Sequence, residues 1–170
     1  MKIMRAMGTF IPNKSHKFPK DGKLLIFSTD LFKTMNFFTG VGVLGQIGSL
    51  AYFQLVNPSY FSIAIFGISL WGSIWSWREA NYAVEDVKLL TDGKIIEIRT
   101  CSFRKKYKII YLPIIDIKGS QDKGYYYLFH NKCRYWLDNS GTIFHKDLFD
   151  AILKGSEIST TLFIKEFRNY

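Results

Sequence analysis

The chain has 170 residues, 48% of them hydrophobic and 17% aromatic, and a formal net charge of +9 at pH 7. This length leaves room for one small soluble core beside any other element. Three scattered histidines and two cysteines without a CxxC spacing exclude a recognisable metal site, and we expect no cofactor. Basic charge is typical of nucleic-acid binding. A membrane surface accounts for it more simply, so no nucleic-acid partner is expected.

The chain opens with a basic arm, residues 1–33. Its first acidic residue is Asp21, and residues 1–20 are similar in composition to a mitochondrial presequence. Pro12 and Pro19 interrupt any long amphipathic helix there. A targeting signal and a basic arm lying along headgroups or a partner both remain open. A secretory signal is excluded, because no long apolar run precedes the prolines and lysines.

An uncharged segment, residues 34–77, dominates the chain. Asn57-Pro58-Ser59 divides it into two pieces, and a bilayer core of about 30 Å needs about 20 apolar residues of helix. We therefore predict a transmembrane helical hairpin. A pair of buried helices in a soluble protein is the less favoured alternative. The hairpin's flanks are basic and its connecting loop is uncharged, which favours both termini on the matrix or cytoplasmic side.

Small residues spaced four apart predict close helix packing within this segment or against a partner. Gln46 stands near the middle of the first piece and is expected to bond across helices. Aromatic residues near the end of the second piece indicate a membrane-interface belt. The predicted packing residues are Gly45, Ser49, Ser69, Ser73, Gly72 and Ser76, and the predicted belt is Trp71, Trp75, Trp77 and Tyr82.

After a linker at 78–83, residues 84–157 predict a small antiparallel β-module with a final helix. Asp92-Gly93 lies between two apolar runs, which is a strong hairpin signal. The stretch Gly119–Gly124 is predicted to form a turn. Leu148, Phe149 and Ile152 lie on one face of the predicted final helix. We therefore expect an α+β membrane protein whose β-module resembles a pleckstrin-homology domain. Residues 158–170 are expected to form a tail. Strands are expected at 84–90, 94–100, 107–111, 114–117, 125–130 and 133–137.

No catalytic motif occurs in the chain. His145 and Asp147 could form an acid/base pair, but no candidate nucleophile accompanies them, so we expect no enzyme. Cys101 and Cys133 could form a disulfide, although two free thiols are favoured. A basic cluster is either a solvated turn or a contact to a partner or to an anionic phospholipid such as cardiolipin. It consists of Arg104, Lys105, Lys106 and Lys108.

Two local patterns carry a family resemblance. They are Val87-x-Leu89-Leu90-x-Asp92-Gly93-x-x-x-Glu97-Ile98, and Leu137-Asp138-x-x-Gly141-x-Ile143 leading to Leu148-Phe149-x-x-Ile152. Together with the order of elements from about residue 33 to 157, they resemble the mitochondrial inner-membrane family of transmembrane protein seventy and its relatives.

The resemblance implies a non-catalytic, multi-pass protein of the mitochondrial inner membrane with both termini in the matrix. It also implies a role as accessory subunit or assembly factor, with respiratory-complex subunits as partners. The alternative is a membrane-tethered lipid-binding module outside the respiratory chain, because bacterial membrane proteins with pleckstrin-homology-like modules share this plan.

Overall fold

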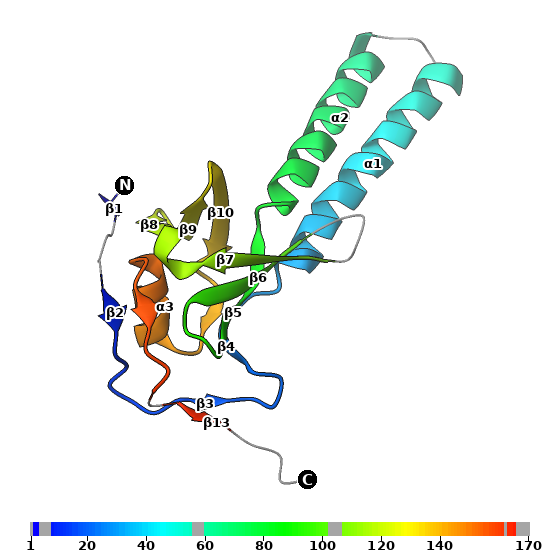
Figure 1. Ribbon diagram of the computed structural model, residues 1–170. Coiled ribbons are helices and arrows are strands. Elements are labelled where there is room, and N and C mark those ends of the chain that lie inside the picture. Colours follow the sequence, from blue (N-terminus) through cyan, green and yellow to red (C-terminus); the bar gives the residue numbers. More distant parts are fainter. Residues whose placement is uncertain (1, 4–7, 56–59, 102–106, 162, 166–170) are drawn as a thin grey trace.

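The computed structural model is an α+β protein with a two-sheet body and a projecting pair of helices (Figure 1). It describes residues 2–3, 8–55, 60–101, 107–161 and 163–165. Every structural statement below concerns these ranges.

A five-stranded antiparallel sheet forms one side of the body, in the order β11-β4-β5-β6-β7. Its centre is the β5–β6 hairpin, in which Val87 lies opposite Ile98. Asp92 Oδ1 accepts hydrogen bonds from the backbone N–H groups of Lys94 and Ile95 and so fixes the turn between them. The strands are β4 (Lys23–Ser28), β5 (Val84–Leu90), β6 (Ile95–Cys101), β7 (Tyr107–Pro113) and β11 (Thr142–Ile143).

A four-stranded antiparallel sheet, in the order β1-β8-β9-β10, forms the other side. A 3₁₀ turn, η1 (Ile114–Asp116), leads the chain from β7 into it. Its strands are β1 (Lys2–Ile3), β8 (Lys118–Asp122), β9 (Tyr125–His130) and β10 (Cys133–Asp138). Two short parallel pairs bring the two ends of the chain together: β2 (Thr9–Phe10) with β12 (Glu157–Ile158), and β3 (Lys17–Phe18) with β13 (Ile164–Lys165).

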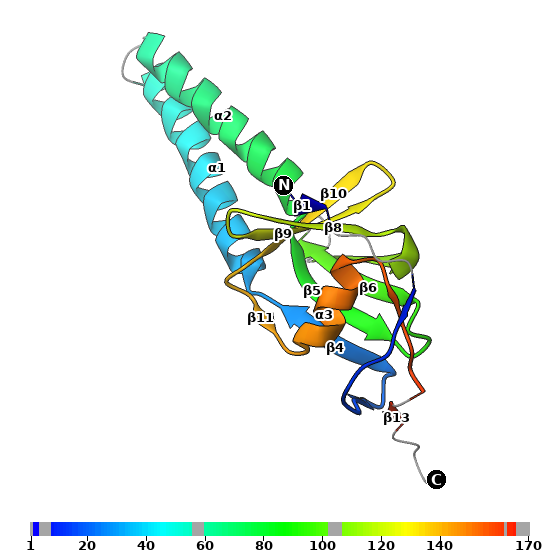
Figure 2. The same ribbon diagram turned by 90° about the vertical axis from the view of Figure 1, so that its left-hand side faces the viewer.

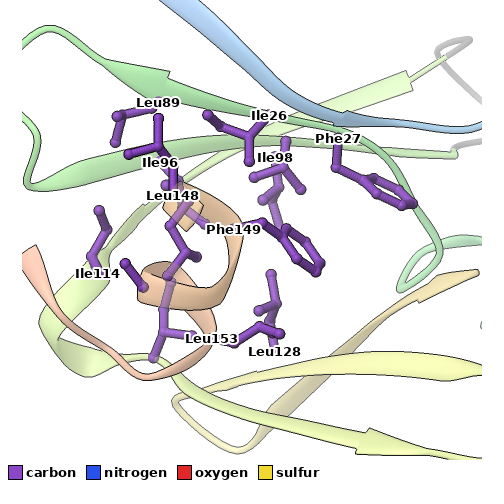
Figure 3. Packing of buried hydrophobic residues seen from close by; sticks show 14 of the residues in the cluster. Ile26, Phe27, Leu89, Ile96, Ile98, Ile114, Leu128, Leu148, Phe149 and Leu153 are labelled. Carbon is purple, nitrogen blue, oxygen red and sulfur yellow. The ribbon is translucent and has the colours of Figure 1, made fainter. Parts of the chain in front are cut away.

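Helix α3 (Lys146–Leu153) packs its apolar face against residues of both sheets (Figure 3). Phe149 stacks on Phe27 of β4, with ring centroids 5.9 Å apart, and meets Tyr126 of β9 edge-on at 5.0 Å. Leu148 and Leu153 are buried in the same cluster. One short helix therefore closes the core because its side chains reach both sheets.

Helices α1 (Leu31–Leu55) and α2 (Tyr60–Ala80) lie side by side and extend away from the body (Figures 1 and 2). They form one insertion between β4 and β5, which are neighbouring antiparallel strands of the same sheet. The basic arm was expected to lie outside the β-module. The structure instead places its run Leu24–Phe27 within strand β4, next to β5.

The predicted transmembrane hairpin is wrong. None of the helices in the described ranges combines the length and the apolar character that crossing a membrane requires. The same finding contradicts the expected multi-pass location in the mitochondrial inner membrane with both termini in the matrix. The prediction relied on the absence of charged residues. A segment can lack charged residues and still contain too many small polar ones to be strongly apolar. Six of the 21 residues of α2 are serine or glycine, which dilute its apolar side chains.

Two smaller predictions also differ from the structure. Residues 114–116 form a 3₁₀ turn instead of a strand, and most of the expected turn at Gly119–Gly124 is strand β8. Gly119 lies against the backbone of Leu153 at the end of α3, where a larger residue would not fit. This glycine therefore allows strand β8 to pack closely against helix α3. From the sequence alone, a glycine in this role cannot be distinguished from a glycine in a turn.

The β9–β10 turn offers a test of the fold. Asn131 and Lys132 both have positive φ, 45° and 66°, as a two-residue type I′ turn requires. Lys132→Gly should relieve strain on the order of 1 kcal/mol and raise the melting temperature by roughly 2–4 °C. The control is Lys118→Gly within β8, which should lower it. Thermal unfolding measures both. An unchanged or lower melting temperature for Lys132→Gly would contradict the turn geometry.

Candidate functional site

The facing sides of α1 and α2 form a seam of small residues. A Cβ added at Gly45 would lie 2.7 Å from Ser69 Oγ, and one added at Gly42 would collide with Ser73 Oγ. Both glycines therefore allow the helices to approach closely at positions that a larger residue would hold apart.

A chain of hydrogen bonds crosses this seam. Gln46 Nε2 donates to Ser73 Oγ at 2.9 Å and to the backbone oxygen of Ser69 at 3.3 Å. Ser73 Oγ in turn donates to the Ser69 backbone oxygen at 2.9 Å. Gln46 thus bonds across the helices, as expected from its position. Because a bonded side-chain amide fixes the register of two helices, this contact aligns α1 with α2.

The structure places most of the predicted packing residues in or beside the seam. Gly45 faces Ser69, Ser73 accepts from Gln46, and Ser49 and Ser76 are buried. Gly72 differs, because a Cβ added there would meet open space. Gly42 was not predicted as a packing residue. Its spacing of three from Gly45 was the signal that could have identified it.

The outer surface of the hairpin is apolar. Large hydrophobic side chains of both helices point away from the seam, and Tyr60 is 94% exposed. An aromatic side chain has about 150–250 Å² of surface. The exposed parts of the hairpin's eight exposed aromatic side chains together present an area on the order of 1000 Å². The largest single apolar patch on a typical monomer covers roughly 300–600 Å², so the total aromatic area exposed on these two helices is large. The eight are Phe37, Tyr52, Phe53, Tyr60, Phe61, Trp71, Trp75 and Trp77.

Polarity in the hairpin is therefore inverted relative to a water-soluble helix pair. Its hydrogen-bonded amide and hydroxyl groups lie between the helices together with Gly42 and Gly45, and its large apolar side chains face outward. The three predicted belt tryptophans belong to this outer surface. Tyr82 does not belong to it: its ring lies 6.0 Å from that of Tyr135 and packs against the core of the body.

An open apolar hollow lies along the two helices, beside Ser49 and Ser62. Its volume is about 320 Å³, and a second hollow of about 140 Å³ lies on the other side of Ser49 and Ser62. The larger hollow is lined by Gly45, Gly48, Ser49, Tyr52, Phe61, Ser62 and Ile65. Both hollows open onto the surface of the hairpin, so side chains from outside the chain can enter them.

A network of charges holds the root of the hairpin. Ser28 Oγ donates to Asp86 Oδ1 at 2.7 Å, and the Thr29 N–H donates to the backbone oxygen of Glu85 at 2.8 Å. Arg99 on β6 pairs with both Asp86 and Glu85. The end of β4 and the start of β5 are therefore tied together where the chain leaves and re-enters the sheet. No local sequence pattern predicts this network, because its members come from three separate strands.

A second ion pair lies on the same sheet. Lys23 Nζ donates to Glu97 Oε2 at 2.6 Å, and Glu97 is only 5% exposed. Burial alone would raise the pKa of the Glu97 carboxyl. The hydrogen bonds from Lys23 and Tyr111 and the charges of Lys23 and Lys88 outweigh burial, so its pKa lies below the ordinary value.

The structure brings His145 and Asp147 together with His16. His145 meets His16, with ring centroids 4.7 Å apart, and His16 Nε2 lies 3.3 Å from Asp147 Oδ2. Burial, and then the neighbouring His16, lower the pKa of His145, while Asp147 opposes this shift. No group of three potential metal ligands occurs in the described ranges.

Lys108 is exposed on β7, whereas Arg104, Lys105 and Lys106 lie outside the described residues. The Cys133 thiol is free.

Neither a protein-family model nor a curated protein matches the chain. The structure presents an apolar helical hairpin on a two-sheet body.

The seam predicts a position-specific effect of bulk. Gly45→Leu should force α1 and α2 apart, costing about 1–3 kcal/mol, because its side chain meets Ser69. Gly48→Leu is the matched control, since a Cβ at Gly48 meets nothing within 4 Å. Amide hydrogen exchange of α1 should speed up in the first variant only. Equal exchange in the two variants would show that Gly45 does not face α2.

The Glu97 pair predicts a pH dependence. Because folding lowers the pKa of this carboxyl, the pair stabilises the fold above the ordinary pKa of 4.5. That contribution is lost as the pH falls through the folded-state pKa. Glu97→Gln should be less stable than the parent at pH 7 and should lose less stability between pH 5 and pH 3. Urea unfolding tests this, with the exposed Asp122→Asn as control. Parallel pH profiles for Glu97→Gln and the parent would count against it.

Proposed function

We propose that the protein is a non-catalytic binding protein that serves as accessory subunit or assembly factor of a larger complex. The observation that carries this proposal is the inverted polarity of the α1–α2 hairpin. Its polar groups are satisfied within the seam, while its apolar side chains point outward. A surface of this size and character marks an interaction site.

The partner that suits this surface is protein, specifically apolar helices. The outer surface includes Gly48, Gly67 and Gly72, where an added Cβ would meet open space, so another helix can approach these positions closely. The apolar hollows beside Ser49 and Ser62 supply room for side chains of such a helix. A respiratory-chain complex is the candidate assembly, because the family resemblance of the sequence implies it.

The body supports this role by holding the hairpin rigidly. The network of Ser28, Asp86 and Arg99 fixes the hairpin's root to the middle of the five-stranded sheet. A binding element held by ordered contacts loses less conformational freedom on association than a flexible one, which favours tight attachment.

The test is to change the outer surface without touching the seam. Leu44 and Ile68 are 69% and 70% exposed, so Leu44→Gln with Ile68→Gln should leave the fold intact. The parent, extracted in mild detergent and run on native gels, should migrate with a complex whose subunits mass spectrometry identifies. The double variant should migrate alone. The control is Ile115→Gln, which is equally exposed but lies on η1, and it should behave as the parent does.

Two outcomes would contradict the proposal. If the parent migrates alone and the purified protein floats with cardiolipin vesicles, the protein binds lipid instead. If the double variant still migrates with the complex, attachment does not use the hairpin.

A further inference from the structure

The free edge of β7 is a second interaction surface. β7 is the last strand of the five-stranded sheet, and its seven residues pair with β6 without a register shift. A straight edge strand of this length exposes backbone groups that can pair with another strand.

Other sheet edges in the described part of the chain are short or covered. β1 and β11 have two residues each. The outer edge of β10 is partly occupied, because the Trp136 N–H donates to the Tyr82 backbone oxygen and Ala83 bridges to Trp136. Within the described ranges, β7 therefore differs from the other edges in being long and in having no strand paired with its outer side.

The direction of the free backbone groups follows from one hydrogen bond. The Ile114 N–H donates to the Lys94 oxygen at 2.8 Å, in register with the β6–β7 pairs. Backbone groups alternate in direction along a strand, so even-numbered residues of β7 point toward β6. The N–H and C=O groups of Tyr107, Ile109 and Tyr111 consequently point toward the free edge. Pro113 has no N–H and ends the pairing surface.

The same three residues have exposed side chains: Tyr107 is 45% exposed, Ile109 44% and Tyr111 55%. An added strand would therefore gain hydrogen bonds and apolar contacts at the same positions.

The order of residues along this edge is nearly symmetric. Reading outward from Ile109 in either direction, the next residue on the same face is a tyrosine. If β7 pairs antiparallel with itself about Ile109, Tyr107 lies opposite Tyr111 of the second copy, and Ile109 lies opposite Ile109 of the second copy. Each pair joins residues whose N–H and C=O groups both point toward the edge. Lys108 then lies opposite Ile110 of the second copy, so like charges are not placed directly opposite each other.

We propose that the protein forms a symmetric dimer through antiparallel β7–β7 pairing centred on Ile109, which joins two five-stranded sheets into one. A single strand pair buries less area than a standard interface, so the dimer should be weak and concentration-dependent. This dimer does not depend on the proposed use of the hairpin, because the two surfaces lie on different elements.

Cross-linking of the full chain tests the geometry. In the proposed dimer the Cα atoms of residue 109 in the two copies are about 5.5 Å apart. This separation lies within the range that a disulfide can bridge. In a background with Cys101→Ser and Cys133→Ser, Ile109→Cys should give a disulfide-linked dimer on mild oxidation. Ile115→Cys is the control, since it is more exposed but lies off the edge. If Ile109→Cys cross-links no more than Ile115→Cys, the proposal is wrong. Association through the hairpin would not distinguish these two positions.

A charge exchange tests the symmetry. Ile109→Lys and Ile109→Glu should each weaken dimerisation by roughly tenfold, because like charges then lie directly opposite. Mixing the two variants should restore it. Sedimentation velocity measures association, and circular dichroism verifies folding. If the mixture associates no better than either variant, or if the parent stays monomeric at every concentration, the second copy is not the occupant. A strand from another protein would then be the remaining candidate for this edge.

Discussion

The structure depends on the pairing of β4 with β5 across a long insertion. These strands are neighbours in the sheet, yet the whole helical hairpin separates them in sequence. Ser28, Asp86 and Arg99 secure the point where the chain leaves the sheet and returns. Because Asp86 is buried, loss of its partners would leave an uncompensated charge, so the network enforces this arrangement as well as stabilising it. The position of the hairpin relative to the body follows from this pairing.

The body and the hairpin follow opposite rules of polarity. In the body, apolar residues such as Leu89 and Ile98 meet α3 in a closed core. In the hairpin, Gln46, Ser69 and Ser73 occupy the inside and the apolar residues lie outside. The body is therefore complete by itself, whereas the hairpin leaves apolar surface that binding would cover. This difference is the physical reason for proposing that the hairpin binds a partner and that the body supports the hairpin.

Local signals predicted the elements that local chemistry determines. Asp92-Gly93 predicted the β5–β6 hairpin, and the apolar face containing Leu148 and Ile152 predicted α3, because turn residues and helical periodicity act over a few positions. The run Leu24–Phe27 was not recognised as a strand, since its partner β5 lies beyond the hairpin. The predicted membrane crossing was wrong because a count of charges cannot weigh serine and glycine against isoleucine and tryptophan. In the seam, Gly45 was predictable from its spacing. The root network was not predictable, because its members meet only in the folded sheet.

The way the hairpin is inserted also bears on how the chain folds. An unstructured loop of this length would lose considerable conformational entropy when β4 pairs with β5. This entropic cost of loop closure grows only slowly with loop length. Two helices that lie side by side bring the ends of the insertion close together through contacts made within the insertion itself. For the sheet, the long insertion then acts like a short connection. The seam formed by Gly42, Gly45 and Gln46 thus lowers the entropic barrier to strand pairing in a body that it does not touch.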